Sequence, residues 1–165
     1  MGLTIALLTI SDTRSLADDS SGDQLQRSLE AADHRLHERQ LCPDDRYQIR
    51  RELSRWIADP EVDVVITSGG TGLTGRDGTP EAVVPLLDKT MEGFGELFRV
   101  LSFESIGTST LQSRCLAGVA NGTFVFVLPG SLDAVTTAWN RLIRAQLDAD
   151  TRPCNLAQLR ARLKE

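Results

Sequence analysis

The segment 69–78 reads GGTGLTGRDG and combines five glycines with the charged pair Arg76 and Asp77. Glycine lets the backbone adopt positive φ values and lets amide N–H groups approach a ligand without an intervening side chain. Such amides, followed by the N-terminus of a helix, favour an anion. We therefore predict that this glycine loop binds phosphate. The alternative is a long connection that needs only flexibility.

The glycine loop does not follow the P-loop pattern, because neither Lys-Ser nor Lys-Thr comes after its glycines. Other groups must then hold a phosphate. Arg76 could neutralise part of the phosphate charge, or it could point outward into solvent. Asp77 is the acidic group of the loop, and carboxylate oxygens are ligands that Mg²⁺ prefers.

A second acidic turn, Pro43-Asp44-Asp45, lies between a predicted strand and a predicted helix. One aspartate is enough to cap that helix. The other could join Asp77 in holding one Mg²⁺, with substrate phosphates completing the coordination shell. Two adjacent carboxylates exceed what capping needs, but sequence spacing alone does not show that Asp44 and Asp77 meet.

Two further turns follow predicted strands. Ser11 and Asp12 follow the strand at 3–10, and they could line a pocket or bond only to their own backbone. Pro129, Gly130 and Ser131 follow the strand at 123–128 and open a helix, where they could bind a second anion. Ligands of open α/β sheets gather beyond the carboxyl ends of the strands, so these turns are expected to share a crevice with the glycine loop.

The elements that position these turns alternate between strands and helices. The apolar run at 62–67 is β-branched and bounded by glycines, which indicates a strand buried on both faces of a parallel sheet between helix layers. Further strands are predicted at 3–10, 37–42, 116–119 and 123–128, with the strand 37–42 near an edge and Asn121-Gly122 forming a hairpin turn between the last two.

Helix starts are predicted from capping patterns. Ser21 and Gln24 form a possible capping box, followed by an apolar stripe of Leu25, Leu29, Ala32 and Leu36. Thr79 is predicted to cap a helix that has Pro80 at its first position. Three more helices are indicated by Ile49, Leu53, Trp56 and Ile57, by the segment 92–103, and by Val135, Ala138, Trp139, Leu142 and Ile143.

Several smaller features are open to more than one interpretation. Gly93 and Gly95 weaken the helix at 92–103 and could permit a close approach of another segment. Ser113 and Arg114 belong to a hydroxyl-rich stretch that is either an ordinary loop or a second anion contact. Both tryptophans are predicted to lie in the core. The tail from residue 148 carries leucines among arginines and could pack on a neighbouring subunit.

Length and composition limit the class of protein. A chain of 165 residues fits one domain with a sizeable core. Its net charge of −5 argues against a nucleic-acid partner, and no apolar run is long enough to cross a bilayer, so we expect a cytoplasmic protein. Three cysteines without a CxxC pair predict neither disulfides nor a zinc site. His34 and His37 are expected to be solvated.

Seven segments together resemble the MoaB/MogA family of molybdenum cofactor biosynthesis proteins, and the match looks closer to the MoaB branch. They are SDTR (11–14), SSGDQL (20–25), TSGGTGLTGRDGTPEA (67–82), EGFGELFR (92–99), SFESIGTSTLQSR (102–114), LPGS (128–131) and TRPCN (151–155). The resemblance covers nearly the whole chain. It implies a three-layer α/β/α domain with a mostly parallel sheet, assembled as a homotrimer or a pair of trimers.

The resemblance also implies an activity. Active members adenylylate the terminal phosphate of molybdopterin with Mg-ATP and release pyrophosphate. The motifs then assign phosphate binding to the glycine loop and the key carboxylates to Asp77 and Asp44. The full set implied for the substrate or phosphate site is Ser11, Asp12, Gly69, Gly70, Thr71, Gly72, Arg76, Pro129, Gly130 and Ser131.

Three hypotheses follow for function. The first is a molybdopterin adenylyltransferase that uses Asp44 and Asp77 to hold Mg²⁺ or to orient phosphate. The second is a non-catalytic paralogue that binds molybdopterin and assembles with other enzymes of the pathway. The third is another nucleotide-using enzyme on the same sheet. Transfer to a phosphate needs alignment and charge neutralisation rather than proton removal, which suits a site of aspartates, amides and an arginine.

Overall fold

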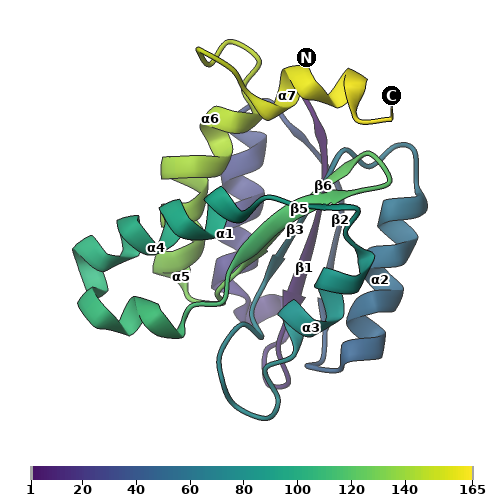
Figure 1. The fold of residues 1–165 in the computed structure, drawn as a ribbon. Coiled ribbons are helices and arrows are strands. Elements are labelled where there is room, and N and C mark those ends of the chain that lie inside the picture. Colours follow the sequence, from purple (N-terminus) through teal and green to yellow (C-terminus); the bar gives the residue numbers. More distant parts are fainter. Residues whose placement is uncertain (1, 165) are drawn as a thin grey trace.

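The computed structural model describes residues 2–164, which form a six-stranded mixed sheet flanked by helices (Figure 1). The strands are β1 (Thr4–Ile10), β2 (Arg35–Cys42), β3 (Val64–Ser68), β4 (Lys89–Thr90), β5 (Leu116–Ala120) and β6 (Thr123–Leu128), in the order β2-β1-β3-β6-β5-β4. Strands β2, β1, β3 and β6 are parallel, whereas β5 and β4 run antiparallel to their neighbours. The predicted, mostly parallel sheet is confirmed.

Helices cover both faces of the sheet (Figure 1). One face packs against α1 (Ser20–Glu30), α4 (Glu92–Ile106) and a long helix made of α5 (Leu132–Ala138), a π-helical turn (Trp139–Ile143) and α6 (Arg144–Leu147). The other face packs against α2 (Arg46–Ala58) and α3 (Thr79–Val83), which a short 3₁₀ turn (Val84–Leu86) extends. The three layers expected from the sequence are therefore present.

The central strands are buried on both faces. In β1, Ile5 and Leu7 enter one hydrophobic cluster while Ala6 and Leu8 enter the other. This alternation follows from the two-residue period of a strand, and it explains why β1, β3 and β6 read as continuous apolar runs. Strand β2 is partly exposed at the sheet edge, as its polar sequence predicts.

Two predicted helix starts are wrong by one or two residues. Asp19, not Ser21, caps α1, because its buried carboxylate accepts from the Gly22 amide at 3.0 Å. The helix ends at Glu30, so the apolar stripe does not continue on it through Leu36, which belongs to β2. Gly78 is the N-cap of α3, and Thr79 is its first residue.

The hairpin and the core predictions are confirmed. Asn121 and Gly122 both have positive φ and join the antiparallel strands β5 and β6. Trp56 and Trp139 are buried. Gly95 faces strand β5 so closely that a Cβ atom there would lie 2.8 Å from the carbonyl oxygen of Cys115, whereas a Cβ at Gly93 would meet nothing. The predicted close approach therefore holds for Gly95 alone.

The expectation that both histidines are solvated is wrong. His34 is partly buried: its Nδ1 accepts from the Leu3 amide at 3.1 Å and its ring packs edge-on against Trp139. His37 is also partly buried and lies 3.5 Å from the Asp59 carboxylate. Both therefore have structural contacts in the helix and strand layers.

The tail packs on its own chain. Its helix α7 (Leu156–Leu159) and the following 3₁₀ turn (Arg160–Arg162) lie across the amino ends of the strands (Figure 1). Leu156 and Leu163 contact the hydrophobic cluster of this same chain, so no neighbouring subunit is needed to cover these two side chains. All three cysteines are free, and none of the helices in residues 2–164 is long and apolar enough to cross a membrane.

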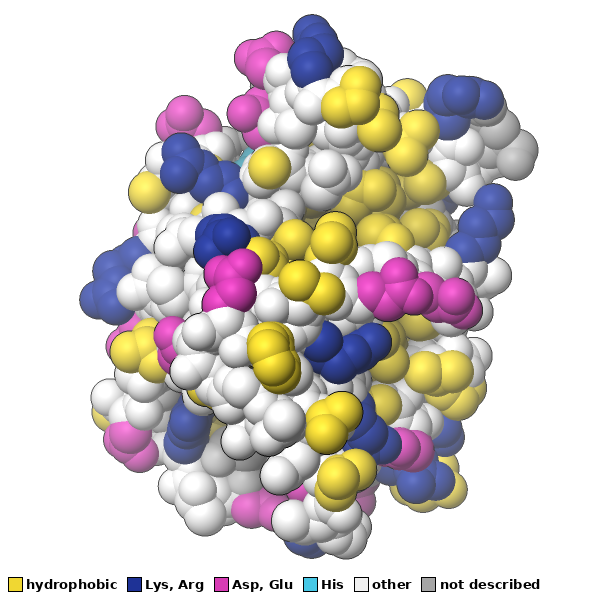
Figure 2. Space-filling view, turned by 60° about the vertical axis from the view of Figure 1, so that its left-hand side comes forward, with side chains coloured by type: hydrophobic (Ala, Val, Ile, Leu, Met, Phe, Trp, Pro, Cys, Tyr) yellow, Lys and Arg dark blue, Asp and Glu magenta, His cyan; other side chains and the backbone are white. Residues whose placement is uncertain are grey.

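Helix α4 leaves part of its surface without cover. Leu97, Val100, Phe103 and Ile106 recur along one side of the helix and are about half exposed or more, and Leu111 of the adjoining 3₁₀ helix (Gly107–Gln112) continues them. We call these five residues the apolar face of α4. Figure 2 views this side of the molecule and shows hydrophobic side chains gathered among charged ones.

Candidate functional site

Four of the turns identified in the sequence meet at one edge of the sheet. Strands β1, β2, β3 and β6 are parallel neighbours, so the segments that follow them emerge on the same side. Ser11 and Asp12 follow β1, Asp44 follows β2, the glycine loop follows β3, and the segment 129–131 follows β6. These turns therefore lie side by side at the carboxyl ends of the parallel strands, as predicted.

The glycines allow the turns to touch. Gly69 has a φ of +103°, and a Cβ there would lie 2.2 Å from the carbonyl oxygen of Ile10. A Cβ at Gly130 would lie 3.1 Å from Cα of Gly69, so the second turn packs directly on the first residue of the glycine loop. The Gly69 amide donates to the Leu128 carbonyl at 3.0 Å. These contacts fix the start of the loop against β1 and β6.

Asp12 joins two of the other predicted residues. Its Oδ1 accepts from the amide of Asp44 at 2.9 Å and from Nη2 of Arg76 at 2.8 Å, while its Oδ2 accepts from Nε of Arg76 at 2.9 Å. Arg76 thus makes a two-pronged ion pair with Asp12 instead of pointing outward. Asp12, Asp44 and Arg76 therefore lie together, whereas a ligand pocket at Asp12 stays a prediction.

Asp44 presents an unsatisfied acceptor to the glycine loop. Its Oδ1 is buried and has no hydrogen-bond partner. A Cβ at Gly70 would lie 2.7 Å from this oxygen and 2.2 Å from Oγ1 of Thr79, so only glycine fits at position 70. The neighbouring Asp45 caps α2 by accepting from the amides of Tyr47 and Gln48. Asp45 therefore caps α2, whereas Asp44 faces the glycine loop.

Asp77 is held within the glycine loop itself. Its Oδ2 accepts from the amide of Thr74 at 2.9 Å and from the Thr74 hydroxyl at 2.6 Å. The same carboxylate oxygen would lie 2.6 Å from a Cβ at Gly72, so the backbone approaches it closely. The rotamer of Asp77 is consequently fixed before any ligand arrives.

The three carboxyl groups differ in their electrostatics. The hydrogen bond from Arg76 lowers the pKa of Asp12, and the hydrogen bond from the Thr74 hydroxyl lowers the pKa of Asp77. Desolvation raises the pKa of Asp44, and repulsion by Asp12 and Asp77 raises it further. Asp44 is therefore the only one of these three carboxyl groups whose pKa is raised, although the charge of Arg76 partly offsets the repulsion.

The residues present fit a divalent cation shared with a ligand. Within residues 2–164, no cluster of three or more His, Cys, Asp or Glu side chains is arranged to hold a metal by itself. Mg²⁺ is commonly held by one or two carboxylates together with water and substrate phosphates. The buried Asp44 oxygen without a hydrogen-bond partner faces the glycine loop and is a donor of the type that such an arrangement needs.

Other predicted site residues are engaged in the turns. The Ser11 hydroxyl accepts from the amides of Thr13 and Arg14, which is the turn interpretation. The Ser131 hydroxyl caps α5 by accepting from the Ala134 amide at 3.1 Å. The Gly130 carbonyl accepts from the Ser21 hydroxyl at 2.8 Å and from Arg14 at 3.3 Å. A second anion at Pro129, Gly130 and Ser131 stays a prediction.

Arg114 contacts the glycine loop, which its sequence position does not reveal. The sequence is compatible with an ordinary loop or a second anion contact, whereas in the structure the guanidinium donates to the carbonyls of Thr71, Gly72 and Asp77. Strand β5 runs antiparallel to β6, so the start of β5 lies at the carboxyl edge of the parallel strands. The predicted hairpin was the signal that could have placed Arg114 beside the glycine loop.

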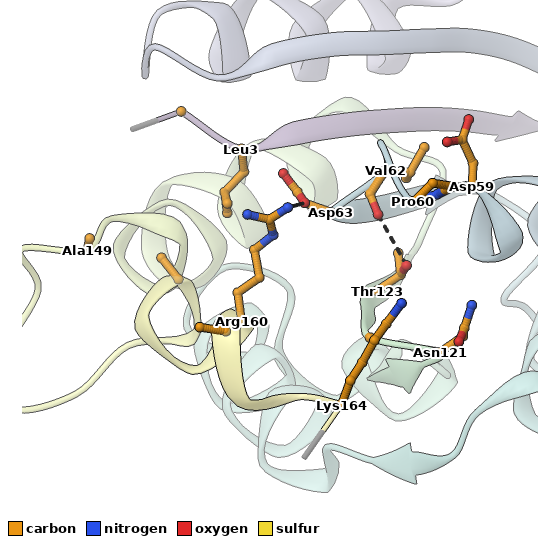
Figure 3. A pocket seen from close by; sticks show the side chains of 14 residues that line it. Leu3, Asp59, Pro60, Val62, Asp63, Asn121, Thr123, Ala149, Arg160 and Lys164 are labelled. Atoms are coloured by element: carbon orange, nitrogen blue, oxygen red, sulfur yellow. Dashed lines mark hydrogen bonds and ion pairs between the residues drawn. The ribbon is translucent and has the colours of Figure 1, made fainter.

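A hollow beside the tail lies at the opposite end of the sheet. It measures about 410 Å³ and is lined by residues that include Asp63, Arg160 and Lys164 (Figure 3). Arg160 forms an ion pair with Asp63, whose other oxygen accepts from the Thr4 amide. None of the predicted site residues lines this cavity, so the chemistry inferred above belongs to the other edge.

Comparison with known proteins shows the family to which the chain belongs. A family model described as "Probable molybdopterin binding domain" matches residues 6–149. Molybdenum cofactor biosynthesis protein B of Escherichia coli K12 is 54% identical over 151 residues, which cover 92% of this chain and 89% of that protein. The chain belongs to the MoaB/MogA family of molybdenum cofactor biosynthesis proteins. The family assignment made from the motifs is confirmed.

Solved MoaB structures share the fold. A crystal structure of molybdenum cofactor biosynthesis protein B is 42% identical and has a TM-score of 0.86, covering 89% of this chain and 92% of that chain. The tungsten cofactor synthesizing protein MoaB from Pyrococcus furiosus is 34% identical, with a TM-score of 0.78 and coverage of 86% and 90%. The MoaB/MogA fold therefore extends over most of the chain.

Proposed function

We propose that this chain transfers the adenylyl group of ATP to the terminal phosphate of molybdopterin. A molybdopterin phosphate oxygen would form a bond to the α-phosphorus, and the bond to the β-phosphate would break with release of pyrophosphate. The observation that carries the proposal is the unpartnered Asp44 oxygen facing a glycine loop at the edge where four strand ends meet.

The residues of the site suit this chemistry. The glycine loop would bind phosphates through its amides, and Arg76 would neutralise phosphate charge after exchanging its contact with Asp12. Asp44 and Asp77 would hold Mg²⁺, which, when bound, stabilises the developing charge on the leaving pyrophosphate. A phosphate nucleophile is already ionised near neutral pH, so the site needs no general base.

The direct test is an assay for the product. Purified protein is incubated with molybdopterin and Mg-ATP, and adenylylated molybdopterin and pyrophosphate are measured. We expect both products in equal amounts. Tight binding of molybdopterin without any turnover would instead support the non-catalytic paralogue that assembles with other enzymes of the pathway. Transfer to many acceptors other than molybdopterin would support a different nucleotide-using enzyme.

Replacing Asp77 by Asn tests the role of the loop carboxylate. Asn keeps the shape and one oxygen that can accept from Thr74, so the protein is expected to fold. The charge is lost, and turnover should fall on the order of 100-fold or more, as for the loss of one transition-state electrostatic contact. Asp45→Asn is the matched control, because Asn also caps helices well, and it should keep full activity. Full turnover by Asp77→Asn would refute the role.

We further propose that the chain associates with copies of itself through the apolar face of α4. Five large hydrophobic side chains are exposed there on one helix and its extension. Large hydrophobic side chains exposed together on one helix are typical of protein interfaces. A homotrimer, or a pair of trimers, is the assembly expected for members of this family.

A further inference from the structure

The side chain of Arg114 hydrogen-bonds to carbonyl groups at both ends of the glycine loop. Its Nη2 donates to the carbonyl oxygens of Gly72 at 2.7 Å and Asp77 at 3.1 Å, and its Nε donates to those of Gly72 at 3.0 Å and Thr71 at 3.2 Å. The remaining Nη1 forms an ion pair with Glu81 in α3. One guanidinium therefore contacts both arms of the loop and the helix that follows it.

These contacts fix the direction of the loop amides. A trans peptide unit is planar, and its carbonyl points opposite to the N–H of the next residue. With the carbonyls of Thr71, Gly72 and Asp77 turned toward Arg114, the amides of residues 72, 73 and 78 turn away from it. Two of them act on the site carboxylates: the Gly72 amide lowers the pKa of Asp77, and the Gly78 amide offsets part of the rise in the pKa of Asp44.

The third amide, that of Leu73, meets no acceptor among the described residues, and it lies on an exposed part of the loop. An N–H group directed away from Arg114 and free of internal partners is suited to a phosphate oxygen. The arginine thus orders the backbone from the side opposite to the ligand.

The shape of the arginine side chain matters here more than its charge. Its positive charge is already paired with Glu81. The side chain is only 29% exposed, so it lies beneath the loop. A guanidinium presents several N–H donors in a fixed planar fork, whereas the ammonium of lysine cannot donate to three carbonyls in the same arrangement.

We propose that Arg114 is a positioning residue that orients the amides of the glycine loop toward a polyphosphate ligand. The inference rests on the proposed function for the identity of that ligand as a nucleoside triphosphate. The effect of Arg114 on polyphosphate affinity, through the ordering of residues 71–78, can be measured by binding alone, without a transfer reaction.

The test compares Arg114→Gln and Arg114→Lys with the parent protein. Calorimetry measures the affinity for tripolyphosphate and for ATP, each with Mg²⁺, and hydrogen exchange measures the amides of 69–79. Both variants should bind tripolyphosphate about tenfold more weakly or worse, since misplaced contacts lose their geometry-dependent strength. Amide exchange should become faster in the loop and stay unchanged in β1 and β6. Lysine should not restore either property.

Arg50→Gln is the matched control. Arg50 also donates to two backbone carbonyls, those of Glu81 and Ala82, but these lie in α3 behind the loop. This variant should keep the affinity and the loop exchange of the parent. Far-UV circular dichroism verifies folding, and if Arg114→Gln fails to fold, Arg114→Lys carries the comparison.

The outcomes separate the two proposals. Parental affinity and loop exchange in the folded Arg114 variants would overturn the positioning role, as would failure of the parent itself to bind tripolyphosphate. A parent that binds tripolyphosphate through an Arg114-dependent loop, yet forms no adenylylated molybdopterin, would refute the proposed activity and leave the positioning role intact.

Discussion

The carboxyl groups of Asp12, Asp44 and Asp77 share one edge of the sheet but have different surroundings. Asp12 is paired with Arg76, and Asp77 accepts from Thr74. Asp44 has a buried oxygen without a partner and two acidic neighbours, so its pKa is raised. A positive charge bound beside Asp44 would therefore offset the desolvation and repulsion of its carboxylate, which are the most unfavourable electrostatic interactions of the site.

Asp44→Asn should therefore stabilise the protein near neutral pH while removing its function. A raised pKa in the folded state means that the favourable contribution is complete below the unfolded pKa, near 3.8, and is lost as the pH rises through the folded value. The ionised carboxylate thus destabilises the fold at neutral pH, and Asn removes that cost. The measurement is the thermal midpoint at pH 7.5 and at pH values near or below 4, where the gain should vanish.

Asp45 supplies the control for this comparison. Asp45→Asn keeps a good helix cap and should leave the midpoint nearly unchanged, whereas Asp45→Ala should cost about 0.5–2 kcal/mol at both pH values. An Asp44→Asn variant that is less stable than the parent at pH 7.5 would contradict the electrostatic account of this residue.

Helix α4 contains two glycines whose replacement by alanine should have opposite effects on stability. A Cβ at Gly93 meets nothing, so Gly93→Ala should stabilise the protein by about 0.5–1 kcal/mol through the helix preference of alanine. A Cβ at Gly95 would press on the Cys115 carbonyl of the adjoining segment, so Gly95→Ala should destabilise by about 1–3 kcal/mol. Denaturant unfolding of the two variants measures both values against the parent.

The pair contains its own control, because the two positions are two residues apart in the same helix and undergo the same chemical change. Equal effects of both substitutions on stability would show that helix propensity alone determines the result. That result would remove the close packing of α4 against the start of β5 as a constraint.

The elements were predictable from sequence to different degrees. Strands β1, β3 and β6 were found because burial on both faces produces uninterrupted apolar runs. The cap of α1 was misplaced because Asp19 is followed by two serines that could cap equally well, and only the buried contacts of Asp19 with Thr9 and Arg39 select it. Strand β4 has two residues, too few for any periodicity.

The site was predictable where residues follow strands. Asp12, Asp44, the glycine loop and the segment 129–131 each come directly after a parallel strand, so topology alone brings them together. Arg114 was not assigned because its partners lie 33 to 43 residues away and it precedes an antiparallel strand. The pairing of Arg76 with Asp12, 64 residues apart, likewise required the three-dimensional arrangement.

For the whole molecule, self-association should depend on the apolar face of α4. The double variant Val100→Asp and Phe103→Asp places two charges where hydrophobic side chains are already exposed, so each protomer should still fold. Burying these charges in an interface is unfavourable, and sedimentation velocity should show a shift from the assembled species to the monomer.

Tyr47→Asp is the corresponding control. Tyr47 is also a large exposed side chain, but it lies on α2 at the opposite face of the sheet. Its substitution should leave the sedimentation coefficient unchanged. If the parent protein is monomeric at all concentrations, or if the double variant assembles as the parent does, the α4 face is not the contact.

The tail and the first strand meet at the edge of the sheet away from the glycine loop. Gly2 and Lys164 line the same cavity there, and α3 with the loop lies at the far end in Figure 1. A fluorophore or surface anchor attached at position 2 or 164 would consequently be held away from the glycine loop by the full length of the strands. The protein can therefore be labelled there without covering the opposite end of the sheet.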